Sequence, residues 1–368
     1  MKTKVLILVI SSFLFLNNSC GSKKAEVNEN EAVQQTYTNP ILDSGDEPWA
    51  IFHEGKYYYT QGSENVIILW ETTDITDLRN ATQKTVWIPK DRSNALHLWG
   101  PEIHFIQNKW YIYFAADDGD TDNHQIYVIE NESANPMEGE FEMKGRISTD
   151  KDNNWAIHAS TFEHNNSRYM IWCGWEKRRI NAETQCIYIA KMKNPWTLST
   201  ERVMISKPEL EWECQWINPD GNKTAYPIYV NEAPQYFHSK NKDKVLIYYS
   251  ASGKWTPYYC VGLLTADANS DLTHPASWKK HPEPVLSLHK ENRVFGPGSL
   301  SFIPSPDHKE WYTLYNARKI PNDASGAISS QTPRLLKVEW DDDGIPHFAT
   351  LDSVGTPLPL PSGITKIR

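Results

Sequence analysis

The chain has 368 residues, a formal net charge of −9 and an aromatic content of 12%. An acidic chain without a basic stripe excludes a nucleic-acid partner, because neutralising phosphates requires a basic surface. The 23 prolines and 18 glycines provide many turns, as an all-β protein with short strands requires, and the length allows one large β domain.

The N-terminus has the features of a targeting signal. Two lysines precede an apolar run, residues 5–16, that is too short to cross a bilayer as a mature helix. Residues 16–20 (Leu-Asn-Asn-Ser-Cys) resemble the signal of a bacterial lipoprotein. We therefore expect residues 1–20 to be a signal peptide ending at a lipidated Cys20, with an ordinary secretion signal as the alternative. Lipidation would anchor the protein in a Gram-negative cell envelope, on the periplasmic or surface face of the outer membrane.

The remaining chain is expected to form a tether and one domain. Residues 21–36 are polar without apolar periodicity, which predicts a flexible tether, and residues 37–368 form the domain. Its cysteines lack metal-ligand spacing, and three of the four lie in strand-like apolar runs. We therefore expect buried free thiols, with a bridge between Cys173 and Cys186 as the alternative. No metal site and no cofactor are expected.

Strand-like segments recur in five groups along this domain. Each group has a first strand, a tight turn, a strongly aromatic second strand, and one or two further strands. The groups cover residues 48–88, 99–129, 155–191, 232–263 and 298–340. Four strands per repeat is typical of a propeller blade. The sequence therefore predicts a single-domain, all-β, five-bladed β-propeller, whereas a β-sandwich does not explain the repeated aromatic second strand.

The start of each first strand is where a propeller places ligand-binding side chains, because these strands line the central channel. Pro234 biases the residue before it to extended geometry and excludes a helix interior, so Glu232 is expected where a loop enters a strand. The corresponding positions in the other groups are Glu47, Glu102, His158 and Ser299.

Ordered motifs from about residue 39 to residue 348 resemble the five-bladed propeller glycoside hydrolases of family 43. The motifs include residues 39–42 (Asn-Pro-Ile-Leu), 98–102 (Leu-Trp-Gly-Pro-Glu), 231–234 (Asn-Glu-Ala-Pro), 248–253 (Tyr-Tyr-Ser-Ala-Ser-Gly), 255–262 (Trp-Thr-Pro-Tyr-Tyr-Cys-Val-Gly) and 295–298 (Phe-Gly-Pro-Gly). The fourth group resembles the branch known mostly for α-L-arabinofuranosidases. The resemblance implies an exo-acting, inverting enzyme. It would remove α-L-arabinofuranosyl or β-xylosyl units from plant or algal polysaccharide fragments.

The resemblance also implies an acid from blade four and a base from blade one. Glu232 matches the acid. The two carboxyl groups of an inverting glycosidase are separated by about 6.5 to 9.5 Å, which leaves room for the attacking water. The family has Asp directly before the blade-one proline, whereas this chain has Glu47 there and Asp46 one place earlier. Neighbours on a strand face opposite sides, so only one of the two can face the channel, and Pro48 fixes the frame in favour of Glu47. Glu47 is therefore the expected base; Asp46 reaching in through a bulge, or loss of the base, are the alternatives.

The family's tuning Asp in blade three is replaced by His158. A neighbouring carboxylate raises the pKa of the acid, whereas an imidazolium would lower it. We therefore expect a neutral His158 that orients Glu232 through a hydrogen bond. Two alternatives stay open: His158 titrates and shares in proton transfer, or it is a core histidine bonded to a backbone carbonyl.

Further positions are implied as substrate-binding residues. Ser299 stands where relatives usually have a His near the channel axis, beside a cation or water, so no calcium site is expected. Arg334 matches a basic residue that reaches the sugar pocket in relatives, with a surface or salt-bridge role as the alternative. Trp49, Trp99 and Trp172 are candidates to stack on a sugar ring, although each could instead pack within a blade.

The departures at these positions leave a second class of function open, a non-hydrolytic glycan-binding propeller descended from such an enzyme. Two carboxylates facing one open pocket favour an enzyme. A single Glu232 without a partner favours a binding protein.

Overall fold

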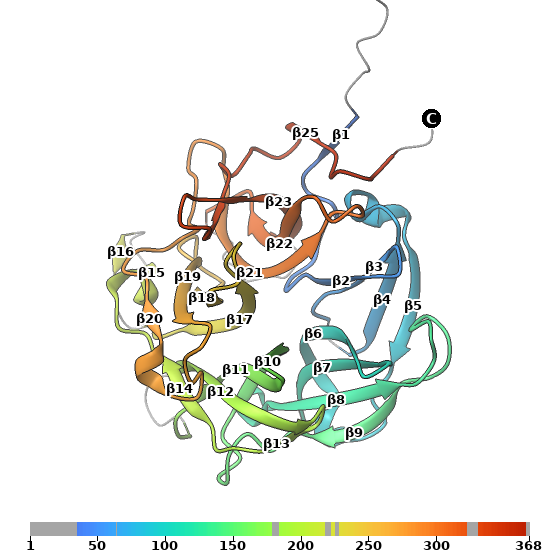
Figure 1. The fold of residues 1–368 in the computed structure, drawn as a ribbon, viewed down its shortest axis with the longest axis vertical. Coiled ribbons are helices and arrows are strands. Elements are labelled where there is room, and N and C mark those ends of the chain that lie inside the picture. The colour runs from blue at the N-terminus through green and yellow to red at the C-terminus, as the bar shows by residue number, and fades with distance from the viewer. Residues whose placement is uncertain are drawn as a thin grey trace, which may run out of the picture. The chain divides into compact units, whose positions relative to one another are not determined.

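Five antiparallel sheets surround a central channel, and they follow one another around the ring in chain order (Figure 1). The structure is a computed structural model that describes residues 35–63, 65–178, 184–217, 222–224, 228–321 and 330–365. It confirms the predicted five-bladed β-propeller. The expected signal peptide, Cys20 and all but the last two residues of the tether lie outside the described residues. Within the described residues, no helix is long and apolar enough to cross a membrane.

Each blade is built from strands that are consecutive in the chain. Blade 1 contains β2 (Trp49–His53), β3 (Lys56–Thr60), β4 (Ile67–Thr72) and β5 (Thr82–Trp87). Blade 2 contains β6 (Leu96–Ile106), β7 (Lys109–Asp117), β8 (Gln125–Asn131) and β9 (Glu142–Arg146). Blade 3 contains β10 (Ala156–His164), β11 (Ser167–Trp175), β12 (Gln185–Asn194), β13 (Thr197–Leu198) and β14 (Val203–Ser206).

The last two blades have four strands each. Blade 4 contains β17 (Asn231–His238), β18 (Lys244–Ala251), β19 (Cys260–Asp267) and β20 (Lys279–Lys280). Blade 5 contains β21 (Phe295–Pro304), β22 (Trp311–Arg318), β23 (Thr332–Trp340) and β24 (Pro346–Phe348). Outside the blades lie the pairs β1 (Thr36–Thr38) with β25 (Pro357–Pro359) and β15 (Trp216–Ile217) with β16 (Lys223–Thr224). Short 3₁₀ helices are η1 (Ile75–Asn80), η2 (Arg92–Asn94), η3 (Thr121–Asn123), η4 (Glu211–Cys214) and η5 (Pro275–Ser277).

The hairpins between first and second strands of blades 1 to 3 share one turn geometry. Each has two residues between the last paired positions, and both have positive φ, as a type I′ turn requires. The turn residues are Glu54 and Gly55, Gln107 and Asn108, and Asn165 and Asn166. The short turn that recurs in the sequence therefore fixes the hairpin of each of these blades locally.

In the described part of the chain, the hydrophobic core consists of five clusters, and each cluster lies between two neighbouring blades. The cluster between blades 5 and 1 closes the ring. The pairing of β1 with β25 and two hydrogen bonds between the Asn39 side chain and the Leu335 backbone also support this closure. Both faces of each sheet are therefore covered by protein.

The four cysteines of the domain are buried, and none forms a disulfide with another described residue. Cys173 pairs in register with Ile187, and Cys186 pairs with Gly174. The two cysteines are therefore offset by one residue, and they belong to different core clusters on opposite faces of the sheet. This offset prevents the bridge between them.

Candidate active site

A backbone feature repeats at the channel mouth in all five blades. One residue near the start of each first strand has a positive φ of 46° to 53°, and in blades 2 to 5 it lies inside a register shift between the first and second strands. These residues are Glu47, Gly100, His158, Ala233 and Ser299. Such a bulge redirects the neighbouring side chains, here into the channel.

The bulges show which residues occupy equivalent positions in the five blades, and two of them differ from the expectation. Gly100, not Glu102, matches Glu47 in blade 2, and Ala233 takes this place in blade 4. Glu102 lies two residues further along β6, where its Oε1 accepts a hydrogen bond from Gln235 Nε2 at 2.6 Å. Glu232 directly precedes its bulge. The sequence comparison missed these offsets because a bulge adds a residue without leaving a signal in the hydrophobic pattern.

Glu232 is held at the head of β17 by a tyrosine from the same blade. Tyr259 donates its hydroxyl hydrogen to Glu232 Oε1 at 2.7 Å, and the glutamate is only 6% exposed. Burial raises the pKa of Glu232 above its ordinary value, although His158, Lys254 and the Tyr259 hydrogen bond act in the opposite direction. The net direction of the shift is upward, toward the protonated form.

Glu47 carries the opposite charge state. Its Oε2 accepts a hydrogen bond from the Gly100 amide at 2.6 Å, and its Oε1 lies 2.9 Å from His158 Nε2 and 3.1 Å from Lys254 Nζ. Burial acts to raise the pKa of Glu47, but Lys254 and His158 outweigh burial and hold it well below its ordinary value. Glu47 is therefore an ionised carboxylate in the usual pH range.

Two glycines make room for this arrangement. A Cβ on Gly62 would lie 2.9 Å from Glu47 Oε2, and a Cβ on Gly100 would lie 2.5 Å from the His158 ring. Gly100 also has a φ of 52°, a conformation that favours glycine. Neither glycine can gain a side chain without displacing Glu47 or His158.

Asp46 is directed away from the pocket. Its Oδ1 accepts the hydrogen bond of the Glu47 amide at 2.9 Å, and its Oδ2 pairs with Lys254 Nζ at 2.5 Å. Asp46 is not among the residues that line the pocket, whereas Glu47 is. Of the two acidic neighbours, the structure thus presents Glu47 to a ligand.

Lys254 is the main residue that the sequence analysis missed. It lies in the connection between β18 and β19, and it forms ion pairs with both Asp46 and Glu47. Burial acts to lower its pKa, but Asp46 and Glu47 outweigh burial and raise it, so Lys254 is a cation. In the sequence, Lys254 lies between two segments that carry the family resemblance, residues 248–253 and 255–262. This location is the sequence feature that could have indicated Lys254 as a site residue.

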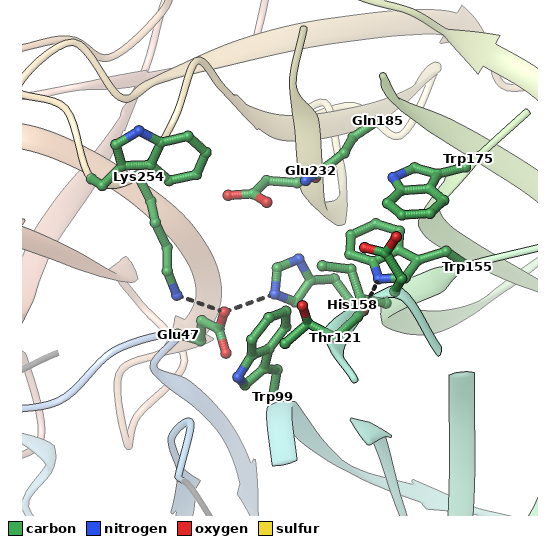
Figure 2. A pocket seen from close by; sticks show the side chains of 12 residues that line it. Glu47, Trp99, Thr121, Trp155, His158, Trp175, Gln185, Glu232 and Lys254 are labelled. Carbon is green, nitrogen blue, oxygen red and sulfur yellow. Dashed lines mark hydrogen bonds and ion pairs between the residues drawn. The ribbon is translucent and has the colours of Figure 1, made fainter. Parts of the chain in front are cut away.

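The carboxylates and the lysine face a pocket of about 240 Å³ (Figure 2). Four tryptophans contribute to its walls: Trp99, Trp155, Trp175 and Trp255. The rings of Trp155 and Trp175 are stacked, with centroids 4.9 Å apart. Trp255 is 43% exposed. Aromatic walls with a few polar groups at one end are suited to a sugar ring.

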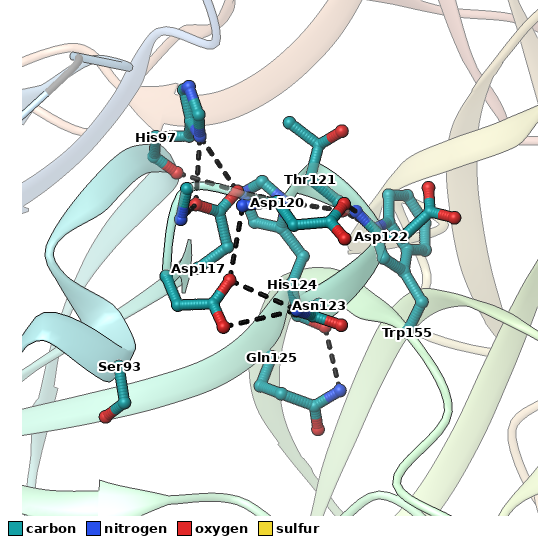
Figure 3. Close-up of polar contacts among 12 residues, drawn as sticks. Ser93, His97, Asp117, Asp120, Thr121, Asp122, Asn123, His124, Gln125 and Trp155 are labelled. Carbon is teal, nitrogen blue, oxygen red and sulfur yellow. Dashed lines mark hydrogen bonds and ion pairs between the residues drawn. The ribbon is translucent and has the colours of Figure 1, made fainter.

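A polar network around Asp117 and His124 supports the pocket wall (Figure 3). The His124 ring stacks on Trp99 with centroids 4.0 Å apart, and the Asp117 carboxylate lies within 3.1 Å of a nitrogen of both His97 and His124. Trp155 donates its ring N–H to the Thr121 carbonyl at 2.8 Å. The network connects two wall tryptophans to the segment that contributes Thr121 and Asp122 to the pocket. Among the described residues, no cluster of His, Cys, Asp and Glu could hold a metal ion.

The substrate-binding candidates are distributed differently from the expectation. Trp99 lines the pocket. Trp49 and Ser299 line a narrow cavity in the channel below it, and Ser299 Oγ lies 3.4 Å from the Tyr259 hydroxyl. Trp49 donates its ring N–H to the Ile103 carbonyl at 2.8 Å, so it joins blades 1 and 2.

Two candidates do not reach the pocket. Trp172 has no exposed surface and packs in the core cluster between blades 2 and 3. Arg334 has no exposed surface either; its Nε donates to Thr332 Oγ1 at 3.1 Å inside blade 5. Both expectations are therefore corrected. The physical reason is that the side chains of β11 and β23 are directed between blades rather than into the channel.

The channel mouth of this propeller brings two buried carboxyl groups with opposite pKa shifts into one aromatic pocket. This arrangement is typical of a glycosidase. Residues 37–346 match the sequence model of the glycosyl hydrolases family 43. The chain belongs to this family.

Similar proteins carry arabinofuranosidase names. The extracellular exo-alpha-(1->5)-L-arabinofuranosidase of Streptomyces avermitilis is 34% identical over 90% of this chain, and the chain spans 66% of that protein's length. The protein of the same name from Streptomyces chartreusis is 33% identical over 77% of this chain and 83% of its own length. The crystal structure of the alpha-L-arabinofuranosidase from Lactobacillus brevis has a TM-score of 0.78 and 30% identity, covering 87% of this chain and 98% of that one.

Proposed function

We propose that this protein is an exo-acting, inverting glycosidase that removes terminal α-L-arabinofuranosyl units from glycans, with Glu232 as the general acid and Glu47 as the general base. The observation that carries the proposal is the pair of carboxyl groups from blades 4 and 1. They line one pocket, and the pKa of Glu232 is raised while that of Glu47 is lowered. Environments that separate two pKa values in this way assign the acid and the base.

The reaction consists of one displacement with balanced proton transfers. Glu232 gives its proton to the glycosidic oxygen as the bond between that oxygen and the anomeric carbon breaks. A water molecule attacks the anomeric carbon from the opposite face and gives a proton to Glu47. The product has inverted configuration, and exchange with solvent restores both carboxyl groups.

The charge and size of the pocket support a single neutral sugar as the bound group. Asp46 and Glu47 together outweigh the positive charge of Lys254, so an anionic sugar would meet a net negative site. The tryptophan walls enclose a pocket rather than an open groove, which favours removal of a terminal unit. The names of the Streptomyces relatives support arabinofuranose as that unit.

One observation favours the second candidate, a glycan-binding protein without hydrolysis. Three donors already bind the two oxygens of Glu47, from Gly100, His158 and Lys254. A carboxylate offers about four lone-pair positions, so one remains on Glu47 for water. Lys254 and His158 also weaken the basicity of Glu47, because they stabilise its ionised form. The same pocket would then hold a sugar without activating water.

The test compares wild type with Glu232→Gln and Glu47→Gln on an aryl α-L-arabinofuranoside, an aryl β-xyloside and arabino-oligosaccharides. We expect Glu47→Gln to abolish turnover of every substrate that wild type hydrolyses. Glu232→Gln should lower turnover of oligosaccharides by about 100- to 10,000-fold, and that of an aryl glycoside with a good leaving group by less, because such a group needs little protonation. Glu132→Gln, on the surface, is the matched control and should behave as wild type. Turnover unaffected by either site substitution would refute the assignment, and sugar binding without turnover would support the second candidate.

We also propose that the protein is attached to the cell envelope through a lipid on Cys20. The support is the apolar run of residues 5–16 followed by the lipoprotein-like residues 16–20. Expression in a Gram-negative host followed by membrane fractionation tests the proposal. Wild type should sediment with membranes and Cys20→Ala should not; equal distribution of the two would contradict lipidation.

A further inference from the structure

His158 contacts the base and the strand of the acid with its two ring nitrogens. Its Nδ1 accepts a hydrogen bond from the Ala233 amide at 3.3 Å, and its Nε2 lies 2.9 Å from Glu47 Oε1. The side chain is 4% exposed, and the positive φ of 53° at its bulge directs it into the channel. Within the described residues, no hydrogen bond joins His158 to Glu232, whose Oε1 accepts from Tyr259.

The Ala233 contact selects one protonation state of the ring. A backbone amide can only donate, so Nδ1 must keep its lone pair, and the ring hydrogen must then be on Nε2, where it points to Glu47. An imidazolium would place an N–H against the Ala233 N–H. Burial acts to lower the pKa of His158, but the neighbouring Glu47 carboxylate outweighs burial, so the pKa is raised. The Ala233 amide opposes protonation of Nδ1, because it needs the lone pair of that nitrogen. The neutral ring with hydrogen on Nε2 satisfies both contacts.

We propose that His158 is a positioning residue for the base: a neutral imidazole that donates from Nε2 to Glu47 and fixes its carboxylate, instead of tuning the pKa of Glu232. The inference rests on the proposed role of Glu47 as the base. The lowering effect of His158 on the pKa of Glu232 requires an imidazolium, so a neutral ring leaves that pKa to burial, Lys254 and the Tyr259 hydrogen bond. The ring also joins β10 to both Glu47 and the bulge beside Glu232, so it fixes the separation of base and acid.

Three variants separate the possible roles. His158→Gln retains an N–H₂ donor that can reach Glu47, His158→Leu fills the space without a donor, and His158→Asp supplies a carboxylate. The acidic limb of the pH profile of kcat/KM reports the base, and the alkaline limb reports the acid. We expect His158→Leu to lower kcat by about 100-fold through misplacement of Glu47 and to move the acidic limb to higher pH, because a donor to the ionised base is lost. His158→Gln should recover most of kcat and the wild-type acidic limb.

The alkaline limb decides between the two roles. It should stay at the wild-type pH in His158→Leu and His158→Gln, and His158→Asp should move the acidic limb upward through repulsion with Glu47. An alkaline limb that shifts in His158→Leu, with the acidic limb unchanged, would refute the inference and assign His158 to the acid. Thermal unfolding of each variant identifies a merely structural effect, which would lower stability without moving either limb.

A measurement without turnover keeps this inference separate from the proposed function. In ¹⁵N-histidine-labelled wild type, the ring resonances that disappear in His158→Gln belong to His158. The inference is supported if the spectra show a neutral ring with hydrogen on Nε2 and if the Nε2 resonance shifts in Glu47→Gln. This holds even if no glycoside tested is hydrolysed. An imidazolium at neutral pH, or a ring with hydrogen on Nδ1, would overturn it even if hydrolysis is confirmed.

Discussion

Replacement of Lys254 by Met provides the sharpest test of how the base is kept ionised. Lys254 Nζ lies 3.1 Å from Glu47 Oε1 and 2.5 Å from Asp46 Oδ2. An opposite charge at this range lowers the pKa of a carboxyl group by about 1 to 3 units, and its removal also leaves Asp46 as an unscreened like charge beside Glu47. Both effects raise the pKa of Glu47. Because the base must be ionised, the acidic limb of kcat/KM should move to higher pH by about 1 to 3 units.

The same substitution should reduce stability in a pH-dependent way. Two buried carboxylates without their cation cost about 3 to 5 kcal/mol at neutral pH, and this loss should become smaller as the pH falls and Glu47 gains a proton. Lys254→Arg retains the charge and is the control for both measurements. An acidic limb at the wild-type pH in a folded Lys254→Met protein would refute the reasoning, because Glu47 would then not depend on Lys254.

Three further predictions follow from individual contacts. Tyr259→Phe removes a donor to ionised Glu232, so the alkaline limb of the pH profile should move to higher pH; a move to lower pH would contradict the contact. Trp99→Ala should raise KM by about 2- to 10-fold through lost stacking on the sugar. Trp172→Ala should instead lower the free energy of unfolding by about 3 to 5 kcal/mol without raising KM. A raised KM in Trp172→Ala with unchanged stability would show that Trp172 contacts the substrate. Trp255→Ala should raise KM for oligosaccharides more than for aryl glycosides, because Trp255 is exposed at the pocket rim; equal effects would place it against the terminal sugar alone.

Much of the fold could be predicted because its signals are local. Alternating strands and two-residue turns such as Glu54-Gly55 and Gln107-Asn108 specify hairpins without reference to the rest of the chain. The hairpins of blades 4 and 5 have longer turns, but the strand pattern repeats in all five blades, and five such repeats leave few architectures other than a propeller. Closure by β1 and β25 was not predicted, because residues 36–38 and 357–359 are too short to give a strand signal.

The candidate site was only partly predictable, for reasons visible in single residues. Glu47 directly precedes Pro48 and Glu232 lies two residues before Pro234, so both strand entrances are marked in the sequence. Trp172 and Arg334 lie in strands whose two faces are both buried, and there the polar–apolar alternation cannot show which way a side chain is directed. From the sequence both are therefore only candidates for the pocket, and the structure packs them inside the propeller.

The sequence alone determined that the chain forms five similar hairpin-based units and that Glu232 and Glu47 stand at the entrances of two of them. The tertiary structure decided which groups meet: Lys254 from a blade-4 loop pairs with Glu47 of blade 1, and His158 of blade 3 contacts Glu47 rather than Glu232. The physical reason is distance along the chain. Strands and turns are set by neighbouring residues, whereas the charge state of Glu47 is set by groups 53 to 207 residues away that only closure of the ring brings together.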